Sequence, residues 1–136
     1  GMDARLVTPD IAEVLARLKW IRFLRFSCDQ DSQIDPILRT CELLQKYGVR
    51  PYRVFVYLLV TDDLESAARR VEALKKLPGI NLYAQAERNE RLGITPNHEQ
   101  LVFAQKYIYS GVYRKETWSD YRLRHPEYFK EALKDD

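Results

Sequence analysis

The sequence predicts an α/β fold in which about three parallel strands alternate with helices, followed by further C-terminal helices. Two observations carry this prediction. Apolar residues recur at helical spacing in several segments, and between these segments they follow the pattern of strands. The segments come in the order helix, strand, helix, strand, helix, strand, helix, which is typical of βαβ units and a parallel sheet.

Length and composition indicate one folded domain. The chain has 136 residues, of which 46% are hydrophobic and 31% charged. The longest apolar run, residues 54–60, is far shorter than the roughly twenty residues of a membrane-spanning helix, and no signal peptide opens the chain. We therefore expect a single α/β domain over residues 1–136, with a helical tail over 113–136, in the cytoplasm and without contact to a membrane.

Helix starts are expected where a capping side chain or a proline precedes an apolar stripe. A capping oxygen accepts a bond from a free amide of the first turn, and proline supplies the backbone angle of a first helical position. These positions are Thr8-Pro9, Asp35-Pro36, Asp62 or Asp63, the break at Pro96-Asn97 before 101–108, Thr117 and Pro126.

Strands are expected over residues 20–26, 52–60 and 80–86, where aromatic and branched residues gather. Alternate side chains of a strand point to opposite faces. In each strand one set is compact and apolar, as expected beneath helices. The other set, the polar face, contains Arg25, Ser27, Asp29, Arg53, Phe55, Tyr57, Leu59, Asn81, Tyr83 and Gln85.

A sheet covered by helices on both faces favours strands that are apolar throughout, so the polar face requires an explanation. One explanation is a (β/α) barrel whose lumen holds a ligand. In such barrels the chemistry lies at the carboxyl ends of the strands, here Asp29, Thr61-Asp62 and Gln85–Arg88. The alternative is that this face is simply exposed to solvent on a small two-layer domain.

The sequence lacks the residues that several kinds of chemistry require. Two cysteines and two histidines provide no metal-ligand spacing, and Cys28 and Cys41 both have the parity of core residues. No catalytic triad or phosphate-binding glycine loop is present. The tail balances its basic residues with acidic ones, and the net charge is +2, so we do not expect a nucleic-acid partner.

Four stretches together resemble a known family. They are MDARLVTPDIAEVLARLK, IRFLRFSCD, ILRTCELLQKYGVRPYRVFVYLLVTDDLESAARRVEALKKL and INLYAQAERN. Their order and spacing, over about residues 2–121, resemble the carboxyl-terminal half of radical S-adenosylmethionine (SAM) proteins, specifically an iron-sulfur oxidoreductase-like group. The resemblance implies a partial (β/α) barrel, open on one side, whose strands here are roughly the fourth to the sixth.

The resemblance also implies which residues help to hold SAM and the substrate. In the family, the ends of these later strands line that pocket. On this chain the matching positions are Arg25, Ser27 and Asp29 on the fourth strand, Arg53 and Tyr57 on the fifth, Tyr83 and Gln85 on the sixth, and Arg88 just beyond it. Asp3 and Arg5 correspond to the end of a preceding strand, which we expect this chain to lack.

The chain departs from the family in one respect that decides its chemistry. The family binds a 4Fe-4S cluster with three cysteines spaced CxxxCxxC, whereas Cys28 and Cys41 are thirteen residues apart. Without the cluster there is no one-electron reductant. We therefore expect a carboxyl-terminal fragment that contributes part of the SAM and substrate pocket but has no catalytic residue, no metal and no cofactor of its own.

Two kinds of partner follow from that expectation. A fragment of a barrel leaves strand edges exposed, which favours pairing with the missing N-terminal half or with a second copy of the chain. The alternative is a stand-alone, cluster-free α/β module that binds a small polar ligand or a protein partner through its polar face.

Overall fold

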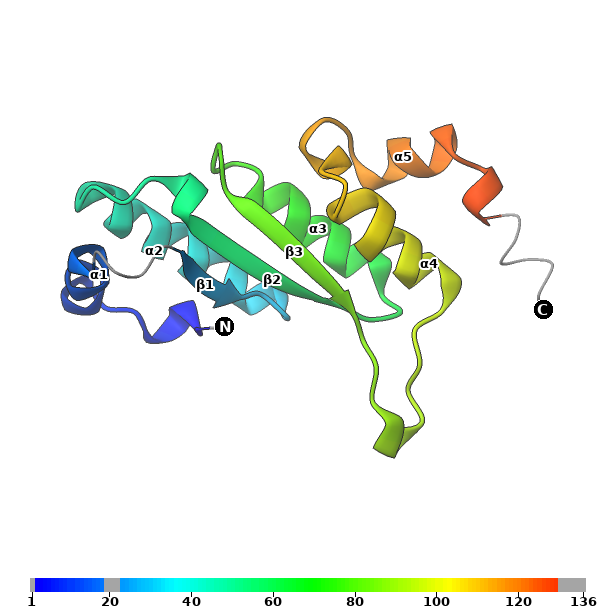
Figure 1. Cartoon of the computed structure of the whole chain (residues 1–136), viewed down its shortest axis with the longest axis horizontal. Coiled ribbons are helices and arrows are strands. Elements are labelled where there is room, and N and C mark those ends of the chain that lie inside the picture. The colour runs from blue at the N-terminus through cyan, green and yellow to red at the C-terminus, as the bar shows by residue number, and fades with distance from the viewer. Residues whose placement is uncertain (1, 19–22, 130–136) are drawn as a thin grey trace.

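The structure is a computed structural model that describes residues 2–18 and 23–129. It confirms the predicted α/β class: three parallel strands form an open sheet and alternate with helices (Figure 1). The strands are β1 (Leu24–Ser27), β2 (Val54–Val60) and β3 (Asn81–Ala86), arranged in the order β1-β2-β3. Strands that follow one another in the sequence are therefore neighbours in the sheet.

Helices of several kinds connect and follow the strands. The α-helices are α1 (Pro9–Arg17), α2 (Ile34–Lys46), α3 (Leu64–Leu74), α4 (His98–Leu101) and α5 (Trp118–Arg124), and α4 continues directly into a π-helix, η5 (Val102–Ile108). Short 3-10 turns are η1 (Ala4–Leu6), η2 (Asp31–Gln33), η3 (Pro51–Arg53), η4 (Glu90–Leu92) and η6 (Val112–Arg114).

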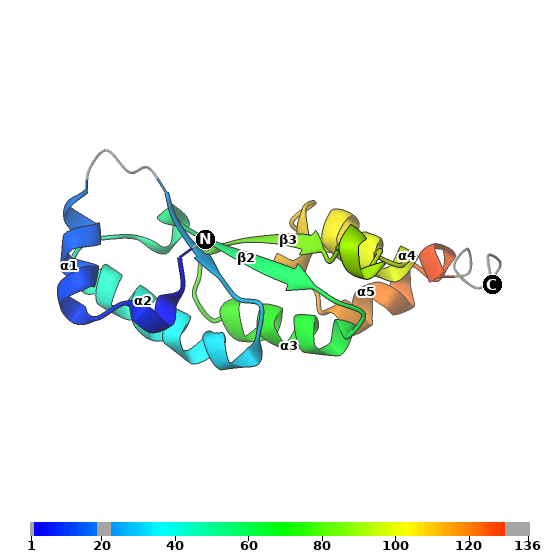
Figure 2. The ribbon, with the colours of Figure 1, turned by 90° about the horizontal axis from the view of Figure 1, so that it is seen from below.

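Helices α2 and α3 cover one face of the sheet (Figure 2). The apolar set of each strand points towards them, and β2 alternates fully buried with half-buried residues along its whole length. Phe26, Val56 and Leu58 are each no more than 1% exposed. Burial of these side chains supplies the main free energy of folding, since each large apolar side chain contributes about 1.5–3 kcal/mol.

The start of the described chain extends the sheet on the outer side of β1. Met2 forms an isolated parallel bridge with Phe26. Its N–H donates to the Arg25 carbonyl at 2.7 Å, and its carbonyl accepts from the N–H of Ser27 at 3.0 Å. Thr40 of α2 holds the next turn by donating its hydroxyl to the Ala4 carbonyl. Four parallel segments therefore lie side by side at this level of the sheet.

The C-terminal part packs on the outer side of β3. Between β3 and α4 the chain forms a finger, residues 87–97, that projects away from the body (Figure 1). Helix α5 then lies against η5 through an aromatic cluster of Phe103, Tyr107, Trp118 and Tyr121, in which each ring contacts at least two of the others. Tyr107 also donates its hydroxyl to the Glu116 carbonyl at 2.7 Å.

Several predicted boundaries differ from the structure. Helix α2 begins at Ile34 because η2 runs directly into it, so Asp35 lies in the first turn and is not the cap. Arg53 belongs to η3, because Pro51 starts a 3-10 turn there and β2 begins at Val54. The expected strand 20–26 is described only from Phe23 onwards, and Trp20 lies outside the described residues.

The predicted starts of α1, α3 and α5 are confirmed. Thr8, Asp63 and Thr117 each cap their helix by accepting a backbone N–H of the first turn. Both cysteines are buried, as predicted, and neither forms a disulfide. No helix in the described ranges has the length and apolar character that a membrane crossing requires.

Candidate functional site

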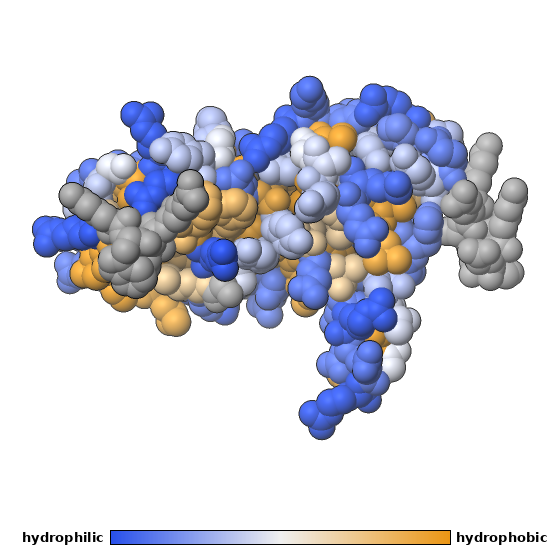
Figure 3. Space-filling model, viewed as in Figure 1, coloured by the Kyte–Doolittle hydropathy of each residue, from blue (hydrophilic) through white to orange (hydrophobic). Residues whose placement is uncertain are grey.

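One face of the sheet is uncovered by any helix of the described chain (Figures 1 and 2). We call it the open face. Its side chains are half-buried or exposed, whereas most side chains on the opposite face are buried. Figure 3 shows hydrophobic residues along the middle of this face, with hydrophilic residues around them. The open face consists of Arg25, Ser27, Phe55, Tyr57, Leu59, Asn81, Tyr83 and Gln85.

The combination of parallel strands and an uncovered, partly aromatic face is unusual. All-parallel sheets occur almost always with both faces covered, because their strands bury apolar side chains in both directions. Phe55, Tyr57 and Leu59 of the central strand all lie on the open face. A simple solvent-exposed face would not place three large side chains there, so the open face has the composition of a surface that contacts something else.

Aromatic rings extend across the open face from one side to the other. Phe23 and Phe55 meet edge to face, with ring centroids 4.8 Å apart. Tyr57 lies 5.4 Å from Tyr83, whose ring is in turn 6.3 Å from that of Tyr109, the residue that follows η5. Tyr83 is 43% exposed and Tyr109 is 74% exposed, so both rings remain accessible to a ligand.

The register of the sheet places one polar or aromatic side chain from each parallel segment in a single row. Ser27 pairs with Tyr57, and Tyr57 pairs with Tyr83. Because Met2 pairs with Phe26, the following residue, Asp3, comes next to Ser27 in this row. Asp3 has extended backbone angles, which give its side chain the parity of the open face. We call the set Asp3, Ser27, Tyr57 and Tyr83 the central row.

At one end of the central row, Asp3 forms a close pair with Arg5. The Nε of Arg5 donates to Oδ1 and its Nη2 to Oδ2, at 3.0 and 2.7 Å. Hydrogen bonds from Arg5 are the main cause that lowers the pKa of Asp3 to about 2, with a smaller contribution from the side chain of Gln33. Asp3 is therefore an anion at all ordinary pH values, with a cation beside it.

The carboxyl ends of β1 and β2 are held by a buried polar network. Arg70 of α3 is 3% exposed and donates from Nη1 to the Asp29 carbonyl and from Nη2 to the Leu59 carbonyl, the latter at 3.0 Å. Gln33 accepts the N–H groups of Asp29 and Gln30 at 2.7 and 3.1 Å. These bonds fix the backbone at the end of the sheet where the candidate residues of β1 and β2 emerge.

The structure brings most of the expected site residues to the open face. Ser27, Tyr57 and Tyr83 share the central row, and Gln85 follows along β3. Arg88 lies just beyond the strand, and both line one hollow of about 450 Å³ beside β3. Asp29 is exposed, although its Oδ1 accepts the N–H of Leu59 at 3.1 Å.

Two expected site residues lie apart from this group. Arg25 is exposed on the open face but opposite Phe55, at the amino side of the central row. Arg53 lies before β2 in η3, at the amino end of the sheet. The prediction that Arg53 lies on the same strand as Tyr57 is therefore wrong, because Pro51 starts a 3-10 turn that delays the start of β2 to Val54.

Sequence reasoning missed Arg70, Gln33 and Tyr109. Arg70 could have been found, because it lies three residues after Ala67 and four before Leu74, within the apolar stripe of α3. A charged residue at such a position is buried with polar partners. Gln33 and Tyr109 carry no comparable signal, since their roles depend on a turn and on the end of a π-helix.

The described residues do not fit an iron-sulfur cluster. No three His, Cys, Asp or Glu side chains of residues 2–18 and 23–129 come together as a metal site. Burial raises the pKa of Cys28 and of Cys41 to about 12, so both thiols stay protonated at neutral pH, whereas a cluster is bound by thiolates.

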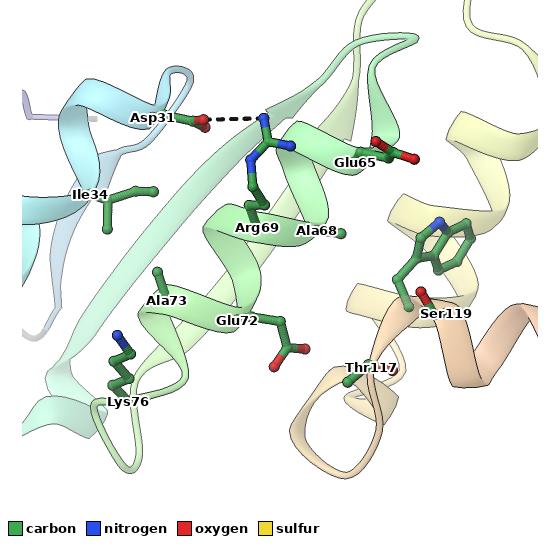
Figure 4. A pocket seen from close by; sticks show the side chains of 11 residues that line it. Asp31, Ile34, Glu65, Ala68, Arg69, Glu72, Ala73, Lys76, Thr117 and Ser119 are labelled. Atoms are coloured by element: carbon green, nitrogen blue, oxygen red, sulfur yellow. Dashed lines mark hydrogen bonds and ion pairs between the residues drawn. The ribbon is translucent and has the colours of Figure 1, made fainter.

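A larger hollow lies elsewhere, on the helix layer (Figure 4). It has a volume of about 800 Å³ and is bordered by α3, by the residues that lead into α2, and by the start of α5. Its charged side chains are partly paired with one another: Arg69 contacts Asp31 at 3.3 Å, and both are exposed. Because it contains no group with a resolved pKa shift or an unpaired buried polar atom, the open face is the stronger candidate site.

Comparison of the chain with family models, curated proteins and solved structures finds no match.

Proposed function

We propose that the open face forms part of the wall of a SAM and substrate pocket in a radical SAM-type (β/α) barrel. The observation that carries the proposal is the central row: four parallel segments present Asp3, Ser27, Tyr57 and Tyr83 side by side on a face that no described helix covers. A barrel lumen is the setting in which parallel strands present polar and aromatic side chains to a ligand.

The chemistry of the open face suits a nucleoside-containing ligand. The rings of Tyr57 and Tyr83 offer a surface on which a purine stacks. Gln85 supplies amide donors and acceptors, and Arg88 supplies a cation for a carboxylate. SAM contains an adenine ring, a ribose, an ammonium group and a carboxylate, and in the family a cluster-bound SAM supplies a carbon radical.

The chain binds and orients a ligand in this proposal, and it does not transfer an electron. Its two thiols are protonated and buried, so the described residues do not bind an iron-sulfur cluster that could supply an electron. The proposed partner is the barrel half that carries the cluster, or a second copy of the chain. Either would add strands next to the Met2 segment and cover the open face from the other side.

A titration monitored by amide NMR of the full chain tests this proposal. Addition of SAM is expected to shift the amide signals of Tyr57, Tyr83 and Gln85, and Tyr83→Ala is expected to weaken binding by about tenfold, a loss typical of one stacking contact. Tyr47→Ala is the matched control, because Tyr47 is a similarly exposed tyrosine at the end of α2. Equal weakening by both variants, or no shift on the open face at millimolar SAM, would contradict the proposal.

A second candidate is a stand-alone module that binds another small polar ligand on the same face. One observation favours it: the ends of the strands are satisfied within the chain, since Gln100 caps the Val60 carbonyl at 2.9 Å and Arg70 caps those of Asp29 and Leu59. The same NMR experiment separates the two candidates. Shifts of the central row with free amino acids or sugars, but not with SAM or adenosine, would favour the second.

A further inference from the structure

Helix α1 carries apolar side chains on two of its sides. Ala12 and Leu15 are buried in the core, where α1 packs on α2. Ile11 and Val14 are 41% and 57% exposed, and Leu18 at the C-cap is partly buried. Because residues three and four apart share one side of a helix, we call Ile11, Val14 and Leu18 the α1 stripe. The outer side of a surface helix is ordinarily polar, so the α1 stripe requires an explanation.

The α1 stripe lies at one end of the molecule. Figures 1 and 2 show α1 beside α2, at the opposite end from α5, and no described helix or strand lies beyond it. Figure 3 shows hydrophobic residues at this end, over α1 and the turn that leads into it. That turn, η1, contains Leu6, which is also exposed. Apolar side chains that gather on an exposed surface indicate a contact with another molecule.

Charges of opposite sign flank the two ends of the α1 stripe. Asp10 lies in the first turn of α1 and Arg17 in the last. They are about two helical turns apart, so both lie on the same flank of the stripe. Arg17 donates from Nη2 to Glu13 at 2.5 Å, and its guanidinium has further N–H groups to donate. None of the ion pairs among the described residues involves Asp10.

This arrangement of charge is complementary to itself. When two copies of α1 lie antiparallel about a twofold axis near Val14, the Asp10 of each copy faces the Arg17 of the other. The two stripes then cover each other, and the opposed helix dipoles attract. A parallel arrangement would instead place like charges together at both ends. Charge complementarity therefore favours a second copy of the chain, in antiparallel orientation, as the molecule that covers the stripe.

We propose that the protein forms a weak homodimer in which the α1 helices of two copies pack antiparallel. An interface centred on one helix of nine residues is smaller than the roughly 800 Å² per partner of a stable complex. We therefore expect a dissociation constant on the order of 0.1 mM. The contact uses the outer side of α1 and leaves the open face free, so the inference does not rest on a ligand there.

Sedimentation equilibrium of the full chain over a range of concentrations, up to about 1 mM, tests the proposal. Val14→Lys places a charge at the centre of the proposed contact and is expected to leave the chain monomeric. Leu123→Lys is the matched control, because Leu123 is an exposed apolar residue of α5 at the other end of the molecule. It is expected to dimerise as the natural chain does. Thermal unfolding checks that both variants are folded.

Charge reversal tests the antiparallel orientation. Asp10→Lys and Arg17→Glu are each expected to weaken dimerisation by about tenfold, because each turns two attractive pairs of the dimer into repulsive ones. An equimolar mixture of the two variants is expected to dimerise as the natural chain does. In the mixed dimer the two introduced charges face each other, and so do the two native ones. Misfolding of either variant would not be reversed by mixing, so the mixture is its own control.

Three results would overturn the proposal. They are a monomer at every concentration, dimerisation that Val14→Lys does not change, and a mixture of the charge-reversed variants that associates no better than either alone. The second result would assign the contact to another surface, such as the edge of the sheet beside Met2. These measurements contain no SAM, and Val14→Lys leaves the open face unchanged for the SAM titration. Failure of either proposal is therefore distinguishable from failure of the other.

Discussion

The carboxylate of Asp29 accepts a hydrogen bond from the backbone N–H of Leu59, with an Oδ1 to N distance of 3.1 Å. Arg70 of α3, on the helix side of the sheet, also links these two residues, because it donates hydrogen bonds to both of their carbonyls. β1 ends at Ser27, two residues before Asp29, so these bonds continue the β1 to β2 connection beyond the last regular pair. They hold the carboxyl end of the sheet in place.

Replacement of Arg70 by methionine is expected to destabilise the protein by about 2–4 kcal/mol, because it leaves two carbonyls at the strand ends without their donors. The measurement is the free energy of unfolding in urea. Arg69→Met is the control, since Arg69 forms an exposed pair with Asp31 whose contribution is about 1 kcal/mol or less. Equal losses in the two variants would show that the network around Arg70 is not structural.

Both cysteine thiols are expected to be inert in the folded chain. Burial raises the pKa of Cys28 and of Cys41 from 9.0 to about 12, and only the thiolate reacts readily with disulfide reagents. Ellman's reagent at pH 8 is expected to modify neither thiol in native buffer and both in urea. Rapid modification of either thiol without urea would contradict the burial of that thiol in the core.

The same pKa shifts predict a loss of stability in alkali. The unfolded thiols release their protons near pH 9, whereas the folded ones keep them until about pH 12. The contribution to stability is therefore complete below pH 9 and declines as the pH rises from 9 to 12. Urea unfolding at a series of pH values measures this decline. A Cys41→Ala variant is expected to show a shallower decline than the natural chain.

The carboxyl group of Asp3 is expected to titrate near pH 2, below its ordinary value of 3.8, because Arg5 donates hydrogen bonds to it. Its favourable contribution is present above pH 3.8 and is lost as the pH falls towards 2. Carboxyl-carbon NMR measures the titration. Arg5→Ala is expected to raise the pKa towards 3.8, whereas Arg17→Ala, which removes an exposed pair with Glu13, is expected to leave it unchanged.

Shortening a buried side chain of the central strand is expected to be among the changes that lower stability most. Leu58 is 1% exposed between the sheet and its helices, and Leu58→Ala is expected to cost about 2–5 kcal/mol through lost burial and the cavity that remains. Leu92, at the tip of the finger, is 72% exposed, and its replacement by alanine is expected to change stability by less than about 0.5 kcal/mol. Thermal unfolding of the two variants compares them.

The order of elements and the two sides of each strand were predictable because they depend on local periodicity. Val54, Val56 and Leu58 alternate with Phe55 and Tyr57, and the structure buries the first set and leaves the second on the open face. Capping by Thr8, Asp63 and Thr117 was predictable for the same reason, since a cap acts within four residues of sequence.

The predicted boundaries that were wrong are those at which two local sequence signals compete. At Arg53 the strand pattern continues from β2, but Pro51 sets the backbone for a 3-10 turn, which ends at that residue. At Asp35 a capping residue precedes proline, yet η2 has already provided the first helical turn. In both cases the neighbouring turn decides the boundary.

The sequence by itself determined the α/β class, the burial of both cysteines and the parity of Ser27, Tyr57 and Tyr83, because each follows from spacing along one segment. The tertiary structure decided which segments lie together: the alignment of Asp3 with Ser27, and the Arg70 bonds to the carbonyls at the ends of β1 and β2. These relationships join residues far apart in the chain, and strand register and helix packing fix them only after the chain folds.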